Sequence, residues 1–372
     1  MIDHSGAFLK IRDSVDIYVA EKNKGLVLVQ FYFINTRRKI SIEIDSRFCG
    51  VLASMDGTRC LSEILLENNL ACDEEADEVI QYLLDSKVIK NVVAEGEKAD
   101  DERYSRQINF LDDWVESLGG LLAQQRILDA ECVVVGVGAV GASIAIQLVR
   151  AGVGKIVLVD CKKLSESSRE RHSYFSEYMV GENKVDVLKS HLNSINESCK
   201  VEAINQRILP GTDLSRIVSD TSSVVINTAD EPYIGHISIK LGRHLWGKGI
   251  PMYVAGGFDA HLMSTGDFFV PGESVCVDCC SGYFTAALKN WKPSYKVHES
   301  QVKRGRVVGG AGGVQPMSLF SASYAAMLIL NYLAGGAAYK NVINKRGEFS
   351  QVGAEINWVD IRGSAECDVC AK

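Results

Sequence analysis

Two pairs of cysteines and one glycine-rich turn are the parts of this 372-residue sequence whose residue types and spacing indicate chemistry. Each cysteine pair has two residues between its members, and the four residues are Cys276, Cys279, Cys367 and Cys370. Four thiolates complete a tetrahedral zinc site and leave no position for water, which is typical of structural zinc. The spacing therefore predicts a Zn²⁺ ion that ties the end of the chain to a segment much earlier in the sequence.

The glycine-rich turn predicts a phosphate-binding loop at the start of a helix. A short β-branched run over 133–135, of the kind buried in a parallel sheet, precedes Gly136, Gly138 and Gly141. Gly136 permits a sharp turn, Gly138 lets the backbone approach a phosphate, and Gly141 lets the next helix pack close to the strand. Asp160 follows the next apolar run, where an acid binds ribose hydroxyls. The alternative is a turn whose glycines serve packing alone, and the pattern does not distinguish ATP from a hydride-transfer cofactor.

Three charged residues further along extend this prediction. Arg171, Lys184 and Asp230 lie where successive strands are expected to end, the edge at which open α/β sheets bind ligands. Arg171 and Lys184 suit triphosphate oxygens, and Asp230 suits Mg²⁺ held together with the phosphates. Each residue alone is equally compatible with an ordinary surface charge. Together with the glycine turn they predict one nucleotide site.

The elements that must position these residues are alternating strands and helices. From residue 103 on, this alternation predicts a doubly wound, Rossmann-like, mostly parallel sheet, and hence an α/β fold. Four strand patterns, three helical patterns and a short returning strand precede it, which predicts a small winged-helix-like α+β domain. An acidic stretch beginning at Ala94 is typical of a linker. We therefore expect one domain over 1–95 and a second over 96–372.

Composition excludes some function classes. A net charge of −7 disfavours nucleic acid as a partner, since such binders usually present a basic surface. No stretch of about eighteen uninterrupted apolar residues is present, which disfavours a membrane span. The N-terminus lacks the basic and then apolar pattern of a signal peptide, so we expect a cytoplasmic protein whose eleven cysteines are thiols or metal ligands.

From Arg103 to its end the chain resembles the ThiF/MoeB/E1-like adenylyltransferases. The resemblance rests on Arg103-Tyr-Ser-Arg106-Gln, the glycine turn, Asp160, Arg171, Val180-Gly-Glu-Asn-Lys184, Thr228-Ala-Asp230 and the paired cysteines. It implies that the three glycines face the ATP phosphates and that Asp160 binds the ribose. It further implies that Arg171 and Lys184 contact the triphosphate, that Asp230 coordinates Mg²⁺, and that Arg106 reaches across a homodimer interface as an arginine finger. These enzymes join a carboxylate to the α-phosphate of ATP and release pyrophosphate.

The first domain carries a resemblance of its own. The segments 55–65 and 79–89 are similar to peptide-clamp domains of the PqqD type, which hold a leader peptide by adding it as a strand to a sheet edge. The alternative is an ordinary winged helix for dimerisation or DNA, and the acidic balance disfavours DNA. Both domains together resemble the peptide-modifying enzymes of microcin C and pantocin A maturation.

Two departures from the family pattern lie in the nucleotide site. Ser168, three residues before Arg171, stands where the family usually has asparagine, and serine is too short for the same paired amide contacts. Lys162 stands where a second acid often follows the ribose acid. In addition, no cysteine lies between Ser281 and Gln315, the region where thioester-forming relatives carry their nucleophile. A covalent relay through that loop is therefore not expected.

The sequence thus predicts a cytoplasmic homodimeric enzyme that binds a ribosomal precursor peptide and uses Mg-ATP to adenylate one of its carboxylates. We expect the activated carboxylate, such as a glutamate side chain, to be captured within the peptide, as in pantocin A maturation. The alternatives are microcin-C-type nucleotidylation of a peptide C-terminus, activation of a sulfur carrier protein, and a scaffold without turnover. Phosphorylation of the carboxylate would need the same site.

Overall fold

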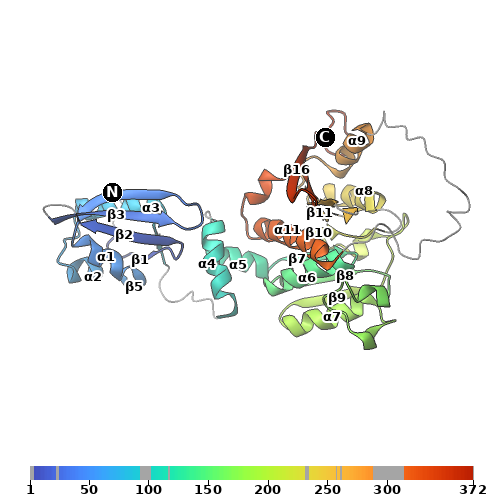
Figure 1. Cartoon of the computed structure of the whole chain (residues 1–372), viewed down its shortest axis with the longest axis horizontal. Helices are drawn as coiled ribbons and strands as arrows, with labels where there is room; N and C mark the ends of the chain where they lie inside the picture. The colour runs from blue at the N-terminus through green and yellow to red at the C-terminus, as the bar shows by residue number, and fades with distance from the viewer. Residues whose placement is uncertain are drawn as a thin grey trace, which may run out of the picture. The chain divides into compact units, whose positions relative to one another are not determined.

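The computed structural model describes residues 4–21, 25–92, 102–115, 118–230, 234–256, 258–259, 262–287 and 314–371. The chain divides into two compact units, Met1–Ser105 and Arg106–Lys372 (Figure 1). The domain boundary predicted after residue 95 falls among residues 93–101, which lie outside the described residues. Most of the loop that lacks a cysteine, residues 288–313, also lies outside them.

The first unit combines two small antiparallel sheets with three helices. Its elements are β1 (Phe8–Ile11), β2 (Val15–Glu21), β3 (Leu26–Phe33), β4 (Lys39–Asp45), α1 (Phe48–Ser54), β5 (Asp56–Cys60), α2 (Leu61–Glu67), α3 (Glu74–Asp85) and β6 (Ile89–Asn91). One sheet has the order β2-β3-β4 and the other β5-β1-β6. The strands and helices are those expected, except that β5 was not predicted, because its sequence has no alternation of apolar and polar residues.

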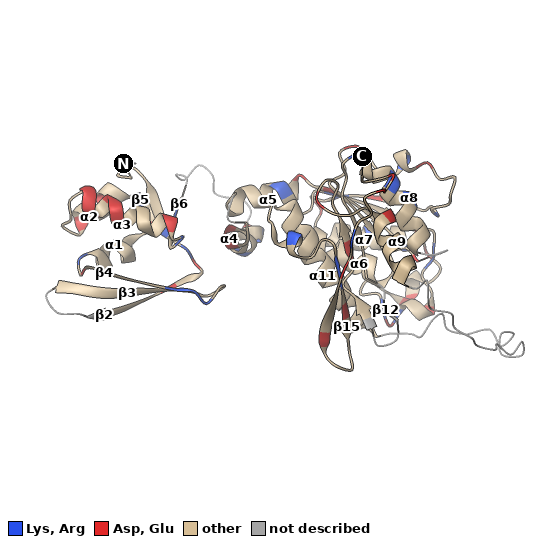
Figure 2. Cartoon of the chain, turned by 90° about the horizontal axis from the view of Figure 1, so that it is seen from above, with Lys and Arg blue, Asp and Glu red and all other residues tan. Residues whose placement is uncertain are grey.

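Alternation along β3 creates the core of this unit. Val27, Val29, Phe31 and Phe33 are buried, and they face helices α1, α2 and α3 across one apolar cluster. The Asp73 side chain accepts the Ala76 N–H at 3.0 Å and so caps the N-terminus of α3. Acidic residues are present on both α2 and α3 (Figure 2).

The second unit is built on a six-stranded sheet of order β14-β11-β10-β7-β8-β9. Five of its strands are parallel, and β14 alone runs antiparallel to its neighbour. The strands are β7 (Glu131–Val135), β8 (Lys155–Val159), β9 (Lys200–Ile204), β10 (Val224–Asn227), β11 (Met252–Val254) and β14 (Asp267–Phe269). The predicted mostly parallel, doubly wound sheet is therefore confirmed. A second, antiparallel sheet contains β12 (Phe258–Asp259), β13 (Leu262–Ser264), β15 (Lys345–Ser350) and β16 (Glu355–Asp360).

Helices cover both faces of the parallel sheet. They are α4 (Ser105–Trp114), α5 (Gly120–Leu128), α6 (Ala139–Arg150), α7 (Lys184–Ile195), α8 (Ile234–Trp246), α9 (Val277–Ala287) and α11 (Gln315–Leu333). Cys132 and Val134 of β7 join the core formed with α6, α7 and α11, whereas Val133 and Val135 join the core formed with α8 and α9. The two-residue period of the strand thus supplies apolar side chains to both layers.

One helix predicted from the sequence is wrong. The pattern near Trp114 to Arg126 predicts a single helix, but in the structure this segment is split between α4 and α5. Gly119 has φ of +77°, which an α-helix does not accommodate, and the Asp112 carboxylate accepts the Gly120 N–H at 2.8 Å. The break therefore comes from a glycine turn with its own side-chain cap.

Among the described residues, α11 is long and apolar enough to cross a membrane by length and composition alone. Half of its apolar window is buried inside the protein, and Ala322, Ala325 and Ile329 belong to the core next to α6. Its apolar character is explained by that packing.

Candidate active site

The predicted nucleotide site lies where the direction of the sheet changes. From β7 the chain continues to β8 and β9 on one side, and then returns to β10 and β11 on the other. In open α/β sheets the crevice at the carboxyl ends of such strands is where ligands bind. The glycine turn follows β7, Asp160 follows β8, and Thr228-Ala229-Asp230 follows β10. The fold therefore brings these three segments to one edge.

The glycines of the turn have different physical roles. Gly136 has φ of +87°, and a Cβ atom there would lie 2.7 Å from the Ala229 nitrogen. A Cβ atom on Gly141 would overlap the Gly136 carbonyl, because α6 packs tightly against the turn. By contrast, a Cβ atom on Gly138, the N-cap of α6, would meet no described atom within 4 Å. Gly136 and Gly141 are thus required for packing, and Gly138 faces open space at a helix N-terminus.

Backbone hydrogen bonds connect Asp160 to both neighbouring segments. One oxygen of its carboxylate accepts the Val137 N–H of the glycine turn at 2.9 Å, and the other accepts the Lys162 N–H at 2.8 Å. The Lys162 carbonyl in turn accepts the N–H of Lys184, the first residue of α7, at 3.0 Å. The ribose acid predicted from the sequence therefore also holds the turn in place.

The predicted phosphate-binding cations and the predicted magnesium ligand are electrostatic neighbours. Burial lowers the pKa of Lys184, and nearby Lys162 and Arg171 lower it further, while Asp160 and Asp230 oppose the shift. Asp230 is largely exposed at the end of β10 and pairs with Lys162 at 3.7 Å. Arg171 is exposed and donates to the Ser167 carbonyl at 3.4 Å. Three cations and two carboxylates thus meet at one edge of the sheet.

Ser168 has a structural position in this edge. Its side chain is buried, and its hydroxyl accepts the Ser165 N–H at 3.3 Å, which closes a capping box around a short 3₁₀ turn. The hydroxyl therefore shapes the turn that carries Arg171. A contact between Ser168 and nucleotide stays a prediction.

Arg106 stands apart from this group. It lies on the exposed surface of α4, and no described residue of the nucleotide site contacts it. The position is compatible with a residue that acts on a second copy of the chain, and that role stays a prediction.

Sequence reasoning missed a pair of rings that supports the glycine turn. The Tyr174 hydroxyl donates to the Val137 carbonyl at 3.2 Å, and its ring stacks on His172 at 5.3 Å between centroids. His172 is buried, and its Nδ1 has no described hydrogen-bond partner. Burial, with smaller effects of Lys184 and Arg171, lowers the pKa of His172 to about 3, so the ring is neutral. Nothing in the Arg171-His172 sequence indicates this packing.

Thr228 is a second supporting residue. Its hydroxyl donates to the Gly136 carbonyl at 2.6 Å, and its backbone N–H donates to the Val135 carbonyl at 2.8 Å. It therefore ties the end of β10 to the glycine turn. A hydroxyl residue directly after a buried strand is the signal that points to this role.

The four cysteines predicted to hold zinc come together. The Sγ atoms of Cys276 and Cys367 are 3.5 Å apart, as are those of Cys279 and Cys370, and all four lie within 4.8 Å of one another. A tetrahedral zinc site with bonds of about 2.3 Å separates sulfurs by roughly 3.8 Å. The cluster therefore fits a structural Zn²⁺, and the ion would tie the last residues of the chain to α9.

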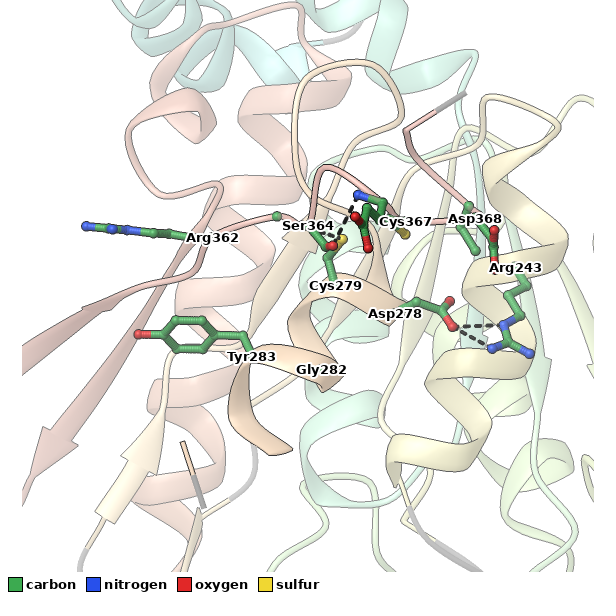
Figure 3. Close-up of a pocket in the computed structure, with 12 residues that line it drawn as sticks. Arg243, Asp278, Cys279, Gly282, Tyr283, Arg362, Ser364, Cys367 and Asp368 are labelled. Atoms are coloured by element: carbon green, nitrogen blue, oxygen red, sulfur yellow. Dashed lines mark hydrogen bonds and ion pairs between the residues drawn. The ribbon is translucent and has the colours of Figure 1, made fainter. Parts of the chain in front are cut away.

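The surroundings of this cluster carry charge. An open hollow of about 650 Å³ borders it, lined in part by Arg243, Asp278 and Arg362 (Figure 3). The guanidinium of Arg243 donates twice to one Asp278 oxygen, at 2.6 and 3.0 Å. The Ser364 N–H donates to the Cys279 sulfur at 3.3 Å, a contact that stabilises a thiolate ligand. The hollow borders the cysteine cluster rather than the glycine turn, so the nucleotide site is argued from the turn and its charges.

The residues at the sheet edge fit Mg-ATP. The α6 N-terminus has no side-chain cap at Gly138, so its free N–H groups and the helix dipole are available to phosphate. Mg²⁺ usually takes one or two protein carboxylates and completes its shell with phosphates and water, and exposed Asp230 suits that role. The edge therefore has the donors, cations and acid that a nucleoside triphosphate with its metal needs.

Comparison with known proteins identifies the family. The model of the ThiF family matches residues 104–369, more than half of the chain, and the chain therefore belongs to the ThiF family. Protein HesA, vegetative, of Trichormus variabilis is 31% identical over 180 residues, which are 48% of this chain and 62% of that protein. The sulfur carrier protein ThiS adenylyltransferase of Escherichia coli is 34% identical over 128 residues, 34% of this chain and 48% of that protein. The chain thus spans less than two thirds of either relative.

A solved structure is similar over both units. The structure of E. coli MccB with MccA-N7isoASN has a TM-score of 0.73 and 19% sequence identity, and the match covers 98% of this chain and 99% of MccB. At that identity the likeness supports the fold and not a shared substrate. The predicted resemblance to this family and the predicted fold class are confirmed.

Proposed function

We propose that the protein uses Mg-ATP to adenylate a carboxylate of a ribosomally made precursor peptide and that the peptide then captures the activated carboxylate. The observation that carries the proposal is that hydrogen bonds and charge interactions join the glycine turn, Asp160, Lys184 and Asp230 at one sheet edge. MccB, a microcin C7 biosynthetic enzyme, has been solved with ATP and with N-formylated MccA, which supports a peptide as the co-substrate.

The residues have these proposed roles. Gly138 and the α6 N-terminus receive the phosphates, Asp160 binds the ribose, and Arg171 and Lys184 neutralise the triphosphate. Asp230 holds Mg²⁺, which neutralises charge that develops on the phosphates. Because the carboxylate attacks the α-phosphorus and pyrophosphate leaves, the protein's contribution is positioning and charge neutralisation. In a homodimer, Arg106 of one protomer would contact the triphosphate held by its partner.

The first unit is proposed to clamp the leader peptide. Both outer strands of the β2-β3-β4 sheet have one edge that pairs with no described strand. A peptide can add to such an edge through main-chain hydrogen bonds. We favour β4, because α3 runs beside it. Arg38, just before β4, donates to the Ser86 carbonyl at the end of α3 at 2.6 Å. Glu75, at the start of α3, lies near Arg47 just past β4.

Half-buried apolar side chains are present on both β4 and α3, and they pack against the apolar cluster of this unit. They are Ile40 and Ile42 of β4 and Val79 of α3.

Hydrogen–deuterium exchange tests the assignment of the peptide to β4, with the opposite edge of the sheet, β2, as the matched control. A bound peptide should protect amides of β4 and leave those of β2 unchanged. Protection of β2 alone would contradict the assignment.

A sulfur-carrier activator is the second candidate, favoured by the similarity to the ThiS adenylyltransferase. It requires a small partner protein ending in Gly-Gly and gives the first unit no role. Under the peptide proposal, the first unit is needed for turnover. A chain that begins at residue 106 should then bind ATP and fail to modify peptide, whereas full activity of that shortened chain on a Gly-Gly protein would favour the second candidate.

Product analysis tests the proposed reaction. Candidate precursor peptides encoded near this gene are incubated with the full chain and Mg-ATP, and the intact peptide mass is measured with AMP, ADP and pyrophosphate. Loss of water with AMP and pyrophosphate supports adenylation and capture. A gain of nucleotide mass indicates microcin-C-type chemistry, and ADP with phosphate indicates an acyl phosphate. No change in any peptide contradicts the peptide proposal.

A further inference from the structure

Lys162 departs from the family pattern and lies at the centre of the candidate site. Its N–H donates to Asp160 at 2.8 Å, and its carbonyl accepts the Lys184 N–H at 3.0 Å. Its side chain reaches Asp230 after a different strand, at 3.7 Å. One residue thus contacts the proposed ribose acid, the proposed triphosphate lysine and the proposed magnesium ligand.

The ion pair between Lys162 and Asp230 is open to solvent. The Asp230 side chain is 81% exposed and that of Lys162 is 37% exposed. Exposed pairs at such a separation contribute little free energy, because water and salt screen them. Breaking this ion pair therefore costs little free energy when stronger partners for both side chains are present. A triphosphate oxygen is a stronger partner for an ammonium group, and Mg²⁺ is a stronger partner for a carboxylate.

We propose that Lys162 is a triphosphate-binding residue that pairs with Asp230 until Mg-ATP binds and then exchanges that carboxylate for a phosphate oxygen. The inference rests on the proposed nucleotide site. The backbone bonds to Asp160 and Lys184 hold the Lys162 main chain still, so the exchange needs only side-chain rotation. Where an acid in this position would add a ligand for the metal, Lys162 adds a third cation beside Arg171 and Lys184.

The consequence is a specific dependence on magnesium. In the absence of Mg²⁺ the Asp230 carboxylate repels the triphosphate and competes with it for Lys162. Removing the Asp230 charge therefore strengthens binding of free ATP, and the gain is larger when Lys162 is present. With Mg²⁺ present the same change weakens binding, since the metal loses its ligand. A residue that merely stabilised the fold would not produce this reversal.

Calorimetric titration with ATP tests the proposal, in EDTA and again with excess Mg²⁺, on the full chain at low salt. Lys162→Met should weaken binding of ATP about tenfold, as for loss of a charge-assisted hydrogen bond. Lys162→Arg should restore most of the affinity. Lys163→Met removes the same charge at the next residue, which is exposed and pairs through its backbone with Asn183, and it should change affinity less than about twofold.

Asp230→Asn completes the test. In EDTA it should tighten ATP binding several-fold, and the gain should be clearly smaller in the double variant with Lys162→Met, where only the repulsion by Asp230 is relieved. Normal ATP binding by the parent chain and by Lys162→Met would overturn this inference and leave the proposed function standing. Failure of the parent chain to bind ATP would instead contradict the proposed function itself. Equal losses in Lys162→Met and Lys163→Met would show a general charge effect and would also overturn the inference.

Discussion

Replacing Gly138 with alanine is expected to separate nucleotide binding from folding. A methyl group there would meet no described atom within 4 Å, and φ of −69° suits any residue. Alanine is a poorer N-cap than glycine by about 0.5 kcal/mol. It also lowers the entropy of the unfolded chain, which stabilises the fold by about 0.4–1 kcal/mol. Because these effects offset each other, we expect Gly138→Ala to unfold within about 2 °C of the parent chain.

The same methyl group would occupy the space proposed for phosphate oxygens. We therefore expect the affinity of Gly138→Ala for Mg-ATP to fall at least about tenfold, or roughly 1.4 kcal/mol. Gly136→Ala is the contrasting variant, since its φ is +87° and its Cβ atom would lie 2.7 Å from a backbone nitrogen. Strain and overlap together should cost roughly 3–5 kcal/mol and lower the melting temperature by about 10 °C.

Differential scanning calorimetry and isothermal titration measure the two effects separately. Unchanged melting of Gly138→Ala with lost ATP affinity agrees with the reasoning. Two results would refute it: normal ATP affinity of Gly138→Ala, or a loss of thermal stability as large as that of Gly136→Ala. The first would mean that phosphates do not approach this turn, and the second that the open space beside Gly138 is filled.

Three further outcomes follow from other contacts. Cys367→Ser should lose bound zinc, measured by elemental analysis, and melt at lower temperature, whereas Cys72→Ser, which changes a thiol outside the cluster, should keep the metal. The pKa of His172 is lowered to about 3, so the unfolded chain binds a proton that the folded chain does not between about pH 3 and 6.5, and stability is lost as the pH falls through that window. On going from pH 7 to pH 5, His172→Gln should therefore lose about 2 kcal/mol less unfolding free energy than the parent chain in urea titrations; equal losses would contradict the buried neutral ring. Tyr174→Phe removes the hydroxyl bonded to the Val137 carbonyl and should lower stability by about 1 kcal/mol while weakening ATP binding, and an unchanged affinity would show that the turn does not depend on it.

Hydrophobic periodicity and motif spacing were sufficient to predict individual helices, strands and turns. The helical pattern of the sequence predicts a helix over 184–195, which is the range observed for α7, and the glycine turn lies between β7 and α6 as its spacing indicates. The cysteine pairs predicted a contact between distant segments, because tetrahedral coordination requires all four thiolates together.

Features that depend on tertiary contacts were not predictable in this way. The bond of the Tyr174 hydroxyl to the glycine turn and the pairing of Lys162 with Asp230 join different loops, and no periodicity marks them. The break between α4 and α5 depends on a carboxylate that caps the second helix from within the first. Ser168 is another example. The hydrogen bonds of its turn are local, but its side chain is buried because the turn packs against residues from other parts of the sequence.

Transfer of oxygen from the peptide carboxylate tests the central claim most directly. A precursor peptide whose carboxylates carry ¹⁸O is incubated with the enzyme and Mg-ATP, and the nucleotide and phosphate products are analysed by mass spectrometry. Attack on the α-phosphorus followed by capture of the acyl group leaves one ¹⁸O atom in AMP for each bond formed. The account predicts that label, whereas ¹⁸O in inorganic phosphate together with ADP would contradict it.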